Sequence, residues 1–260
     1  MKTRKSLAKT LFLSVCGVLA AAMLAGCATP PSPDVLRVGC VTDFAPLIYK
    51  DARGGMAGVE ADLARALGDR LGRKTVFVPM DFDRVLDALL ADRVDIVFAG
   101  LTATDARRVR VDFCNPYLVI AQAAVCRKPE ARKYRGPARV VATPERVGVV
   151  AGTTGDELVS SSFVNAQKIT FSKFDDAIWA LRKNAVDLVV AGEPFAWYAV
   201  AQHANELSLT GARMTEEMLA WAVRPGNHAL RQAANEALAA WQTDGTLDRI
   251  FENNHCPFTK

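Results

Sequence analysis

Short apolar runs alternate with segments of helical leucine spacing between residues 36 and 99. The runs Leu36–Gly39, Val76–Val78 and Ile96–Ala99 have the length and composition of buried strands. Between them, Glu60–Leu71 and Phe82–Leu90 place apolar side chains three to four positions apart, as an amphipathic helix does. Because the elements follow in the order βαβαβ, the pattern predicts a parallel sheet flanked by helices.

The same order of elements returns after Lys128–Pro144, a polar stretch that contains proline and glycine. The second set consists of the strand Val147–Val150, a helix from about Asp156, the strand Lys168–Phe171, the helix Phe174–Lys183 and the strand Leu188–Val190. A further apolar strand at Met218–Val223 and a long helix over about His228–Trp241 complete the pattern.

Two such sets predict an α/β protein of two lobes, each a mostly parallel sheet flanked by helices. The chain is expected to cross between the lobes twice, near Ala121–Arg127 and Leu219–Arg224, which makes a two-segment hinge. On this assignment the first lobe comprises residues 35–124 and 225–260, and the second lobe comprises residues 125–224. Lobes joined in this way can close over a ligand.

The chain begins with the three parts of a secretory signal peptide, which we assign to residues 1–26. A basic segment is followed by the apolar Thr10–Leu24, which is too short to span a bilayer comfortably, and then by small residues. Leu24–Cys27 resembles a bacterial lipobox, in which the cysteine becomes the lipidated first residue of the mature protein. Residues 27–34, rich in proline, would then form an extended lipid-anchored linker.

The alternative is an ordinary signal peptide with an incidental cysteine at position 27. With the lipobox assignment, the sequence predicts a protein of the periplasm or cell surface that a lipid holds to a membrane.

The formal net charge of +4 comes from this leader. Lys2, Arg4, Lys5 and Lys9 lie in it without any acidic residue, so the remaining chain is neutral. A neutral chain without a basic stripe interleaved with aromatic residues offers no electrostatic footprint for nucleic acid. We therefore exclude nucleic-acid binding.

Export would place the remaining cysteines where disulfides persist. Four cysteines allow three full pairings, and the sequence does not choose among them: Cys40, Cys114, Cys126 and Cys256. The histidines are scattered and no CxxC pair is present, so we expect neither a metal site nor a cofactor.

The segment Asp95–Phe113 carries the main candidate for ligand chemistry. Its predicted strand ends in Gly100-Leu101-Thr102, where a glycine lets the backbone approach a ligand at the carboxyl end of a sheet. Arg107 follows and offers a planar donor fork that matches a carboxylate. The alternative is that Arg107, Arg108 and Arg110 form a solvated basic face.

The run Met80–Tyr117 resembles the signature of the periplasmic solute-binding proteins of the amino-acid-binding type, the family 3 receptors of ABC importers. The similarity extends from Leu36 to Glu252. It implies the two-lobed periplasmic-binding-protein fold and assigns Gly100 and Thr102 to hydrogen bonds with the ligand and Arg107 to its α-carboxylate. It also matches Phe44 and Phe82 to positions that stack on the ligand, although an aromatic residue in such a stretch is equally often part of the core.

In the second lobe, Gly152-Thr153-Thr154 precedes a predicted helix, whose free N–H groups and dipole favour an anion. The resemblance implies that this segment holds the other side of the ligand carboxylate. Alternatively, Thr154 caps the helix, and both roles are compatible because they use different atoms.

The chain departs from the family at the positions that receive the ligand's ammonium. Gly192, followed by Glu193, stands where the family has an aspartate, and Val41 stands at a second aspartate position, with Asp43 two residues later. Either Glu193 and Asp43 reach inward, or the ligand lacks an α-ammonium, because a buried ammonium without a carboxylate is strongly disfavoured.

These features predict a monomeric, lipid-anchored binding protein for amino-acid transport. It would capture a small, carboxylate-bearing, amino-acid-like ligand and deliver it to an ABC permease in the inner membrane. One alternative is a ligand-sensing lipoprotein that uses the same cleft. Another is a dehydratase-like enzyme on this fold, but the position of those enzymes' catalytic glutamate aligns with Phe195, so we predict no enzymatic activity.

Overall fold

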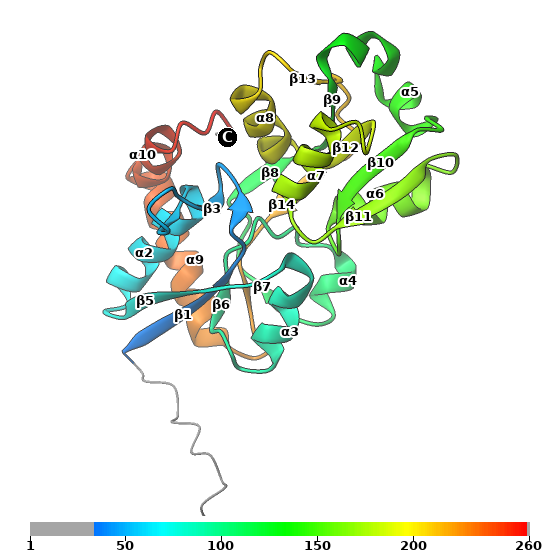
Figure 1. Cartoon of the computed structure of the whole chain (residues 1–260). Coiled ribbons are helices and arrows are strands. Elements are labelled where there is room, and N and C mark those ends of the chain that lie inside the picture. Colours follow the sequence, from blue (N-terminus) through cyan, green and yellow to red (C-terminus); the bar gives the residue numbers. More distant parts are fainter. Residues whose placement is uncertain (1–33, 259–260) are drawn as a thin grey trace, which may run out of the picture. The chain divides into compact units, whose positions relative to one another are not determined.

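Two five-stranded sheets organise residues 34–258, the part of the chain that the computed structural model describes. The strand orders are β5-β1-β6-β15-β7 in the first sheet and β11-β10-β12-β9-β13 in the second (Figure 1). Each sheet forms one lobe, and the expected two-lobed α/β architecture is confirmed.

The first sheet joins parallel strands at one edge to antiparallel strands at the other. β1 pairs in parallel with β5 and β6, whereas β15 is antiparallel to β6 and β7. Its strands are β1 (Val35–Cys40), β5 (Lys74–Pro79), β6 (Ile96–Val97), β7 (Asp112–Phe113) and β15 (Ala222–Val223). The helices of this lobe are α2 (Val59–Arg70), η1 (Phe82–Arg84), α3 (Val85–Leu90), α4 (Asp105–Arg108), α9 (His228–Thr243) and α10 (Thr246–Asn253).

A small antiparallel sheet, which the sequence pattern did not predict, is inserted between β1 and α2. It consists of β2 (Asp43–Phe44), β3 (Ile48–Lys50) and β4 (Met56–Ala57). Strands of two or three residues are too short to show a hydrophobic period. This sheet brings Phe44 to the boundary between the lobes.

The second sheet repeats the parallel arrangement in its first three strands. β10 pairs in parallel with β11 and β12, and β9 is antiparallel to β12 and β13. Its strands are β9 (Gln122–Arg127), β10 (Arg146–Val150), β11 (Gln167–Phe171), β12 (Leu188–Gly192) and β13 (Leu207–Leu209). The helices are η2 (Lys128–Tyr134), α5 (Pro137–Val141), α6 (Thr154–Ser162), α7 (Phe174–Arg182) and α8 (Glu193–Gln202).

The hinge is a pair of short antiparallel strands between the sheets. The chain leaves the first sheet through β8 (Leu118–Ile120) and returns through β14 (Glu217–Leu219), which pairs with β8 (Figure 1). The apolar run predicted as one strand is therefore two, β14 in the hinge and β15 in the first sheet. It bends between them, where the Ala220 N–H donates to the carbonyl of Leu101.

The lobe boundaries consequently differ from the expected ones. β9 lies in the second sheet from Gln122, before position 125, and β15 lies in the first sheet, before position 225. Hydrophobicity alone does not distinguish these positions because both crossing segments are mainly apolar.

The core of the first lobe is built around Trp221, which is fully buried. Its ring lies 4.6 Å from that of Phe98, 5.6 Å from Tyr117 and 6.4 Å from Trp241, measured between centroids. Such aromatic contacts add to the free energy gained by apolar burial. They connect β6, the hinge segment and α9 beneath the carboxyl end of the sheet.

The four cysteines that were expected to be able to form disulfides are unpaired thiols in the structure. Each is buried and packs as a small apolar side chain. Burial raises the pKa of Cys40 and Cys114 to about 12 and that of Cys126 and Cys256 to about 11, which leaves little reactive thiolate at neutral pH.

Within residues 34–258, no helix combines the length and apolar character needed to cross a membrane. The same residues contain no group of three His, Cys, Asp or Glu side chains placed to hold a metal ion. The predicted signal peptide, Cys27 and the linker up to residue 33 lie outside the described residues.

Candidate functional site

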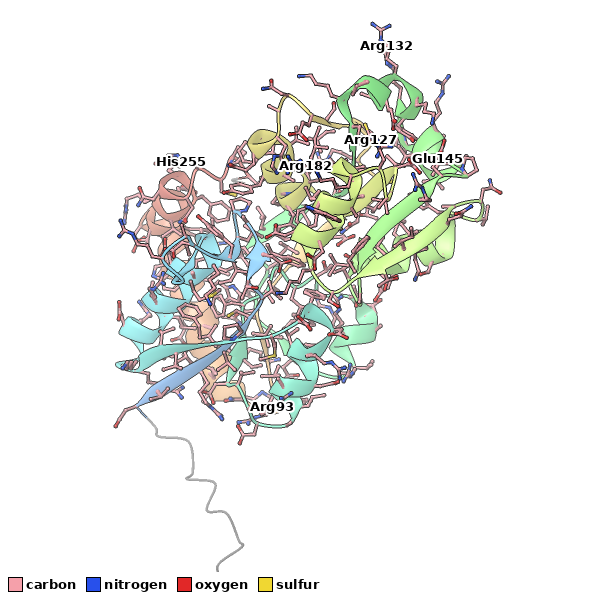
Figure 2. The ribbon with its side chains drawn as sticks, viewed as in Figure 1. Arg93, Arg127, Arg132, Glu145, Arg182 and His255 are labelled. Atoms are coloured by element: carbon pink, nitrogen blue, oxygen red, sulfur yellow. The ribbon has the colours of Figure 1, made fainter. Side chains whose placement is uncertain are left out.

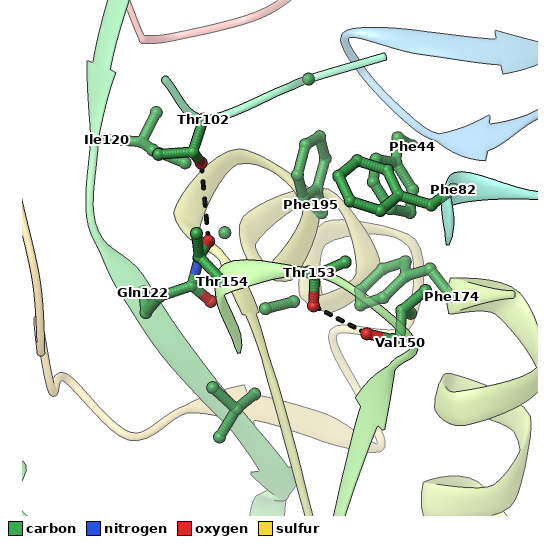
Figure 3. A pocket seen from close by; sticks show the side chains of 14 residues that line it. Phe44, Phe82, Thr102, Ile120, Gln122, Val150, Thr153, Thr154, Phe174 and Phe195 are labelled. Atoms are coloured by element: carbon green, nitrogen blue, oxygen red, sulfur yellow. Dashed lines mark hydrogen bonds between the residues drawn. The ribbon is translucent and has the colours of Figure 1, made fainter. Parts of the chain in front are cut away.

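A pocket lies between the two lobes, where small-molecule sites are often found (Figure 3). It lies at the carboxyl ends of β6, β10 and β12, as expected for an open α/β sheet. The lining residues come from both lobes and the hinge: Phe44, Phe82, Gly100, Thr102, Ile120, Gln122, Val150, Thr153, Thr154, Phe174, Val190, Ala191, Gly192 and Phe195.

The structure thus brings together seven of the predicted site residues. These are Phe44, Phe82, Gly100, Thr102, Thr153, Thr154 and Gly192. Sequence reasoning missed the other lining residues because they are apolar positions of predicted elements or lie in the hinge. Asp43, Leu101, Arg107 and Glu193 do not line the pocket.

Four phenylalanine rings form the apolar side of the pocket. The Phe44 ring lies 5.5 Å from Phe82, 4.6 Å from Phe195 and 6.4 Å from Phe174, measured between centroids (Figure 3). Phe44 and Phe82 belong to the first lobe, and the other two rings begin α7 and α8 of the second. Contact between these rings therefore holds the lobes together as well as lining the pocket.

The ring of Phe195 fits against two glycines. A Cβ at Gly100, whose φ is +59°, would lie 2.7 Å from Phe195 Cζ. A Cβ at Gly192 would lie 3.0 Å from Phe195 Cε2 and equally close to Ile120 Cδ1. The ring thus occupies the space into which a larger side chain at position 192 would extend, so the glycine at 192 and the phenylalanine at 195 depend on each other.

The polar side of the pocket is tied to one carboxylate. Glu217 of β14 is buried and accepts from Thr102 Oγ1 at 2.8 Å and from Thr154 Oγ1 at 2.7 Å. Gln122 Nε2 lies 3.0 Å from Thr154 Oγ1 and 3.3 Å from Glu217 Oε2. Thr215 Oγ1 donates to the other carboxylate oxygen at 2.9 Å. A hinge residue that the sequence analysis did not identify therefore connects hydroxyls of both lobes.

Thr153, and not Thr154, caps α6. Its hydroxyl oxygen accepts from the backbone N–H of Asp156 at 3.2 Å and donates to the carbonyl of Val150 at 2.8 Å. The hydroxyl of Thr154 is consequently free to bond Glu217. The helix cap and the pocket contact thus use neighbouring threonines.

Arg107 is buried and joins the lobes beside the pocket. Its Nη1 donates to the carbonyl of Thr102 at 2.9 Å, and its Nη2 donates to the carbonyl of Gly152 at 2.8 Å. The guanidinium lies 5.4 Å from the centre of the Phe82 ring. Burial lowers the pKa of the Arg107 guanidinium, so an anion placed beside it would be favoured.

The three arginines do not form one solvated face. Arg107 is 6% exposed, whereas Arg110 pairs with Asp87 on the surface at 2.6 Å. Arg108 lies over the ring of Phe113. Only the first of them is near the pocket.

Neither acid proposed to replace the missing aspartates reaches the pocket. Glu193 lies 3.2 Å from Arg213 in an ion pair, with its backbone N–H bonded to the carbonyl of Ala121. Asp43 accepts from the backbone N–H of Phe174 at the first turn of α7. Both departures from expectation have the same cause. Each carboxylate is bonded to a donor of the protein, Glu193 to Arg213 and Asp43 to the N–H of Phe174.

Gly100 and Leu101 also have other partners. The Gly100 N–H donates to Glu60 Oε2 at 2.7 Å, and Tyr117 donates its hydroxyl to Glu60 Oε1 at 2.9 Å. Burial raises the pKa of Glu60 to about 7. Leu101 is a core residue whose carbonyl accepts from Ala220, and it does not line the pocket.

Charged side chains of the second lobe away from the pocket serve its structure. Arg127 and Arg182 both lie on the second lobe (Figure 2). Arg127 pairs with Asp187 at 2.8 Å, and Arg182 pairs with Glu206 at 2.8 Å. These pairs fasten β9 to the turn before β12 and α7 to the segment before β13. Among the described residues, none that lines the pocket has an ionisable side chain.

Comparison with known proteins places this geometry in a family. Residues 36–255 match the family model described as bacterial extracellular solute-binding proteins, family 3. The L-cystine-binding protein TcyJ of Escherichia coli K12 is 27% identical over 250 residues, which cover 91% of this chain and 92% of TcyJ. A probable histidine-binding protein of Neisseria gonorrhoeae is 30% identical over 246 residues, covering 93% and 90% of the two chains.

Among solved structures, a mutant of ArgBP from T. maritima superposes with a TM-score of 0.81 at 31% identity. The superposition covers 85% of this chain and 95% of that one. ArgBP has also been solved in an arginine-bound form. These proteins are similar to the chain over nearly the whole described region.

Proposed function

The chain belongs to the bacterial extracellular solute-binding proteins of family 3, and from this premise we propose that it captures a small, carboxylate-bearing, amino-acid-like ligand between its lobes. The observation that carries the proposal is the pocket at the carboxyl ends of the strands, which residues of both lobes line. A ligand held by both lobes stabilises the closed arrangement, and the hinge strands β8 and β14 allow opening for its entry.

The contacts between the lobes support capture by closure. Arg107 of the first lobe bonds the carbonyl of Gly152 in the second, and Asp43 bonds the N-terminus of α7. Together with the phenylalanine contacts, they define the arrangement that a bound ligand would favour.

Arg107 is the candidate partner of the ligand carboxylate. Its contacts to Thr102 and Gly152 use two N–H groups, and an arginine has five. The remaining donors are buried beside the pocket, where a charged hydrogen bond is strong because water does not compete.

A thermal-shift screen against the common amino acids and L-cystine tests the proposed function. A ligand that binds only the folded state raises stability by about 2.7 kcal/mol at a hundredfold excess over Kd. At least one amino acid should raise the melting temperature in a saturable way. If none of them does, the assignment of an amino-acid-like ligand is wrong.

The role of Arg107 is tested with the variant Arg107→Ala and calorimetry. Loss of a charged hydrogen bond worth about 1.5–3 kcal/mol should weaken the tightest-binding amino acid by about tenfold to a hundredfold. Its decarboxylated amine, agmatine in the case of L-arginine, should lose less affinity than the amino acid, because it loses only the contribution of Arg107 to the contact between the lobes. Arg110→Ala, which removes a surface arginine paired with Asp87, serves as the control. Unchanged amino-acid affinity in Arg107→Ala would exclude this carboxylate contact.

The wider proposals rest on the leader sequence as well as on the family membership. We propose that Cys27 is the lipidated first residue of the mature protein, that a signal peptide directs its export, and that the monomeric protein delivers its ligand to an ABC permease. A sensing lipoprotein would use the same pocket with a different membrane partner. Phe195 lines the pocket at the position that aligns with the catalytic glutamate of the dehydratases, and its apolar ring supports a binding role, because it can neither donate nor accept a proton.

A further inference from the structure

The threonine hydroxyls that line the pocket already donate their protons to oxygens of the protein. A carboxylate has no proton to give, so Thr102 and Thr154 must direct their hydroxyl protons towards Glu217. The hydroxyl proton of Thr153 goes to the carbonyl of Val150. Each threonine therefore turns oxygen lone pairs, and not a proton, towards any ligand in the pocket.

The amide of Gln122 has a defined orientation for the same reason. The oxygen of Thr154 and the carboxylate of Glu217 both accept, so the amide nitrogen must face them, at 3.0 and 3.3 Å. The amide oxygen points the other way and has no partner, although Gln122 is only 3% exposed. A Cβ at Gly155 would come within 2.9 Å of this oxygen, so the glycine keeps the space beside it open.

A buried acceptor without a partner costs free energy until a donor reaches it. The pocket thus combines one unpaired acceptor, the amide oxygen of Gln122, with threonine oxygens bonded to the Glu217 carboxylate and with four phenylalanine rings. This environment favours a cation that carries several N–H donors. A ligand group that offers only acceptors would face oxygen lone pairs and the Glu217 charge.

We propose that Glu217 is the positioning residue that orients Thr102, Thr154 and Gln122 to receive the ligand's ammonium group. By holding the protons of Thr102 and Thr154 and the nitrogen of Gln122, Glu217 turns three oxygens towards the ammonium and supplies the balancing negative charge. The inference rests on the proposed function and specifies it further. The ligand carries a primary ammonium, and this hinge carboxylate, rather than Asp43 or Glu193, compensates its charge.

Calorimetry with matched ligands tests the proposal. The tightest-binding amino acid of the screen is compared with the acid that lacks only its α-amino group, for example L-arginine with 5-guanidinopentanoate or L-histidine with imidazole-4-propionate. In the wild-type protein, loss of the ammonium should weaken binding by about tenfold to a hundredfold. In Glu217→Gln, which keeps the size and an acceptor oxygen, the preference for the amino acid should fall to a few-fold.

Two further variants separate positioning from folding. Glu216→Gln removes the same charge from the adjacent, exposed residue and should keep the wild-type preference. Glu217→Asp should restore part of the preference because it returns the charge. A general loss of structure in Glu217→Gln would weaken both ligands, whereas the proposal predicts weaker binding of the amino acid with little change for its deaminated analogue.

The outcomes distinguish this inference from the proposed function. If the wild-type protein binds an amino acid and its deaminated analogue equally, or if Glu217→Gln keeps the preference, the role of Glu217 is wrong while the binding function stands. If no amino acid binds the wild-type protein, the proposed function fails, and the inference fails with it.

Discussion

At the scale of single residues, the pocket depends on contacts between side chains that the sequence reveals only in part. Gly192 was recognisable as an unusual residue because a charge was expected there. The reason for the glycine, the ring of Phe195 lying against it, depends on how α8 leaves β12 and is visible only in three dimensions. Glu217 could not be predicted either, because its partners in the pocket, Thr102 and Thr154, are more than sixty residues away along the chain.

The dependence of Gly192 on Phe195 predicts a specific mutational coupling. Gly192→Asp should lower the free energy of unfolding by about 1–3 kcal/mol, because the added atoms overpack against the Phe195 ring and Ile120. In the background of Phe195→Ala, the same substitution should cost less. Urea denaturation of the two single variants, the double variant and the wild-type protein measures the difference. Equal costs in both backgrounds would mean that the two positions are independent.

At the scale of secondary structure, periodicity predicted the long elements and failed at the short ones. The helix expected at Glu60–Leu71 is α2, Val59–Arg70, and its Leu63 and Leu67 lie on the buried face as their spacing predicts. The β2–β4 sheet and the division of β14 from β15 were missed because pairing between distant segments decides them. These missed elements carry Phe44, Asp43 and Glu217, so the errors concentrate where the lobes meet.

Asp43 links two such elements and gives the fold a pH dependence. It lies on β2 and bonds the start of α7, whose own N-cap residue, Lys173, makes no capping hydrogen bond with its side chain. Burial raises the pKa of Asp43 to about 6, against an unfolded value of about 3.9. Because the folded form binds the proton more tightly, the stabilisation is present at low pH and is lost as the pH rises through about 6.

Asp43→Asn should remove this contribution while keeping an oxygen that accepts from Phe174. The variant should gain about 1–3 kcal/mol of stability relative to wild type on going from pH 4 to pH 7. Urea denaturation across this range provides the measurement. Glu60 titrates with the same sign in both proteins and cancels in the difference. Parallel stability curves for the two proteins would contradict the raised pKa of Asp43.

At the scale of the whole molecule, the repeated βαβαβ pattern was sufficient to predict two lobes and a hinge. It was not sufficient to predict the lobe boundaries, since β9 and β15 are apolar on either assignment. It also could not determine the state of the cysteines, which the structure shows to be unpaired and buried in both lobes.

The proposed anchor predicts where the whole molecule resides. Cys27→Ser should move the protein from the membrane fraction to the soluble fraction, because removing the lipid removes the apolar attachment. Fractionation checks this, and mass spectrometry of the wild-type protein should show the added acyl chains. Unchanged membrane association together with an unmodified wild-type mass would contradict lipidation at Cys27.

The central claim is that an amino-acid-like ligand is held between the lobes in the described pocket. A crystal structure of the protein with the tightest-binding amino acid of the screen tests it most directly. The account predicts the ligand beside Thr102 and Thr154. Its carboxylate should lie at Arg107, its ammonium should face the oxygens of the side chains that Glu217 holds, and its side chain should lie among the phenylalanine rings. A ligand bound outside this pocket, or in contact with only one lobe, would contradict the account.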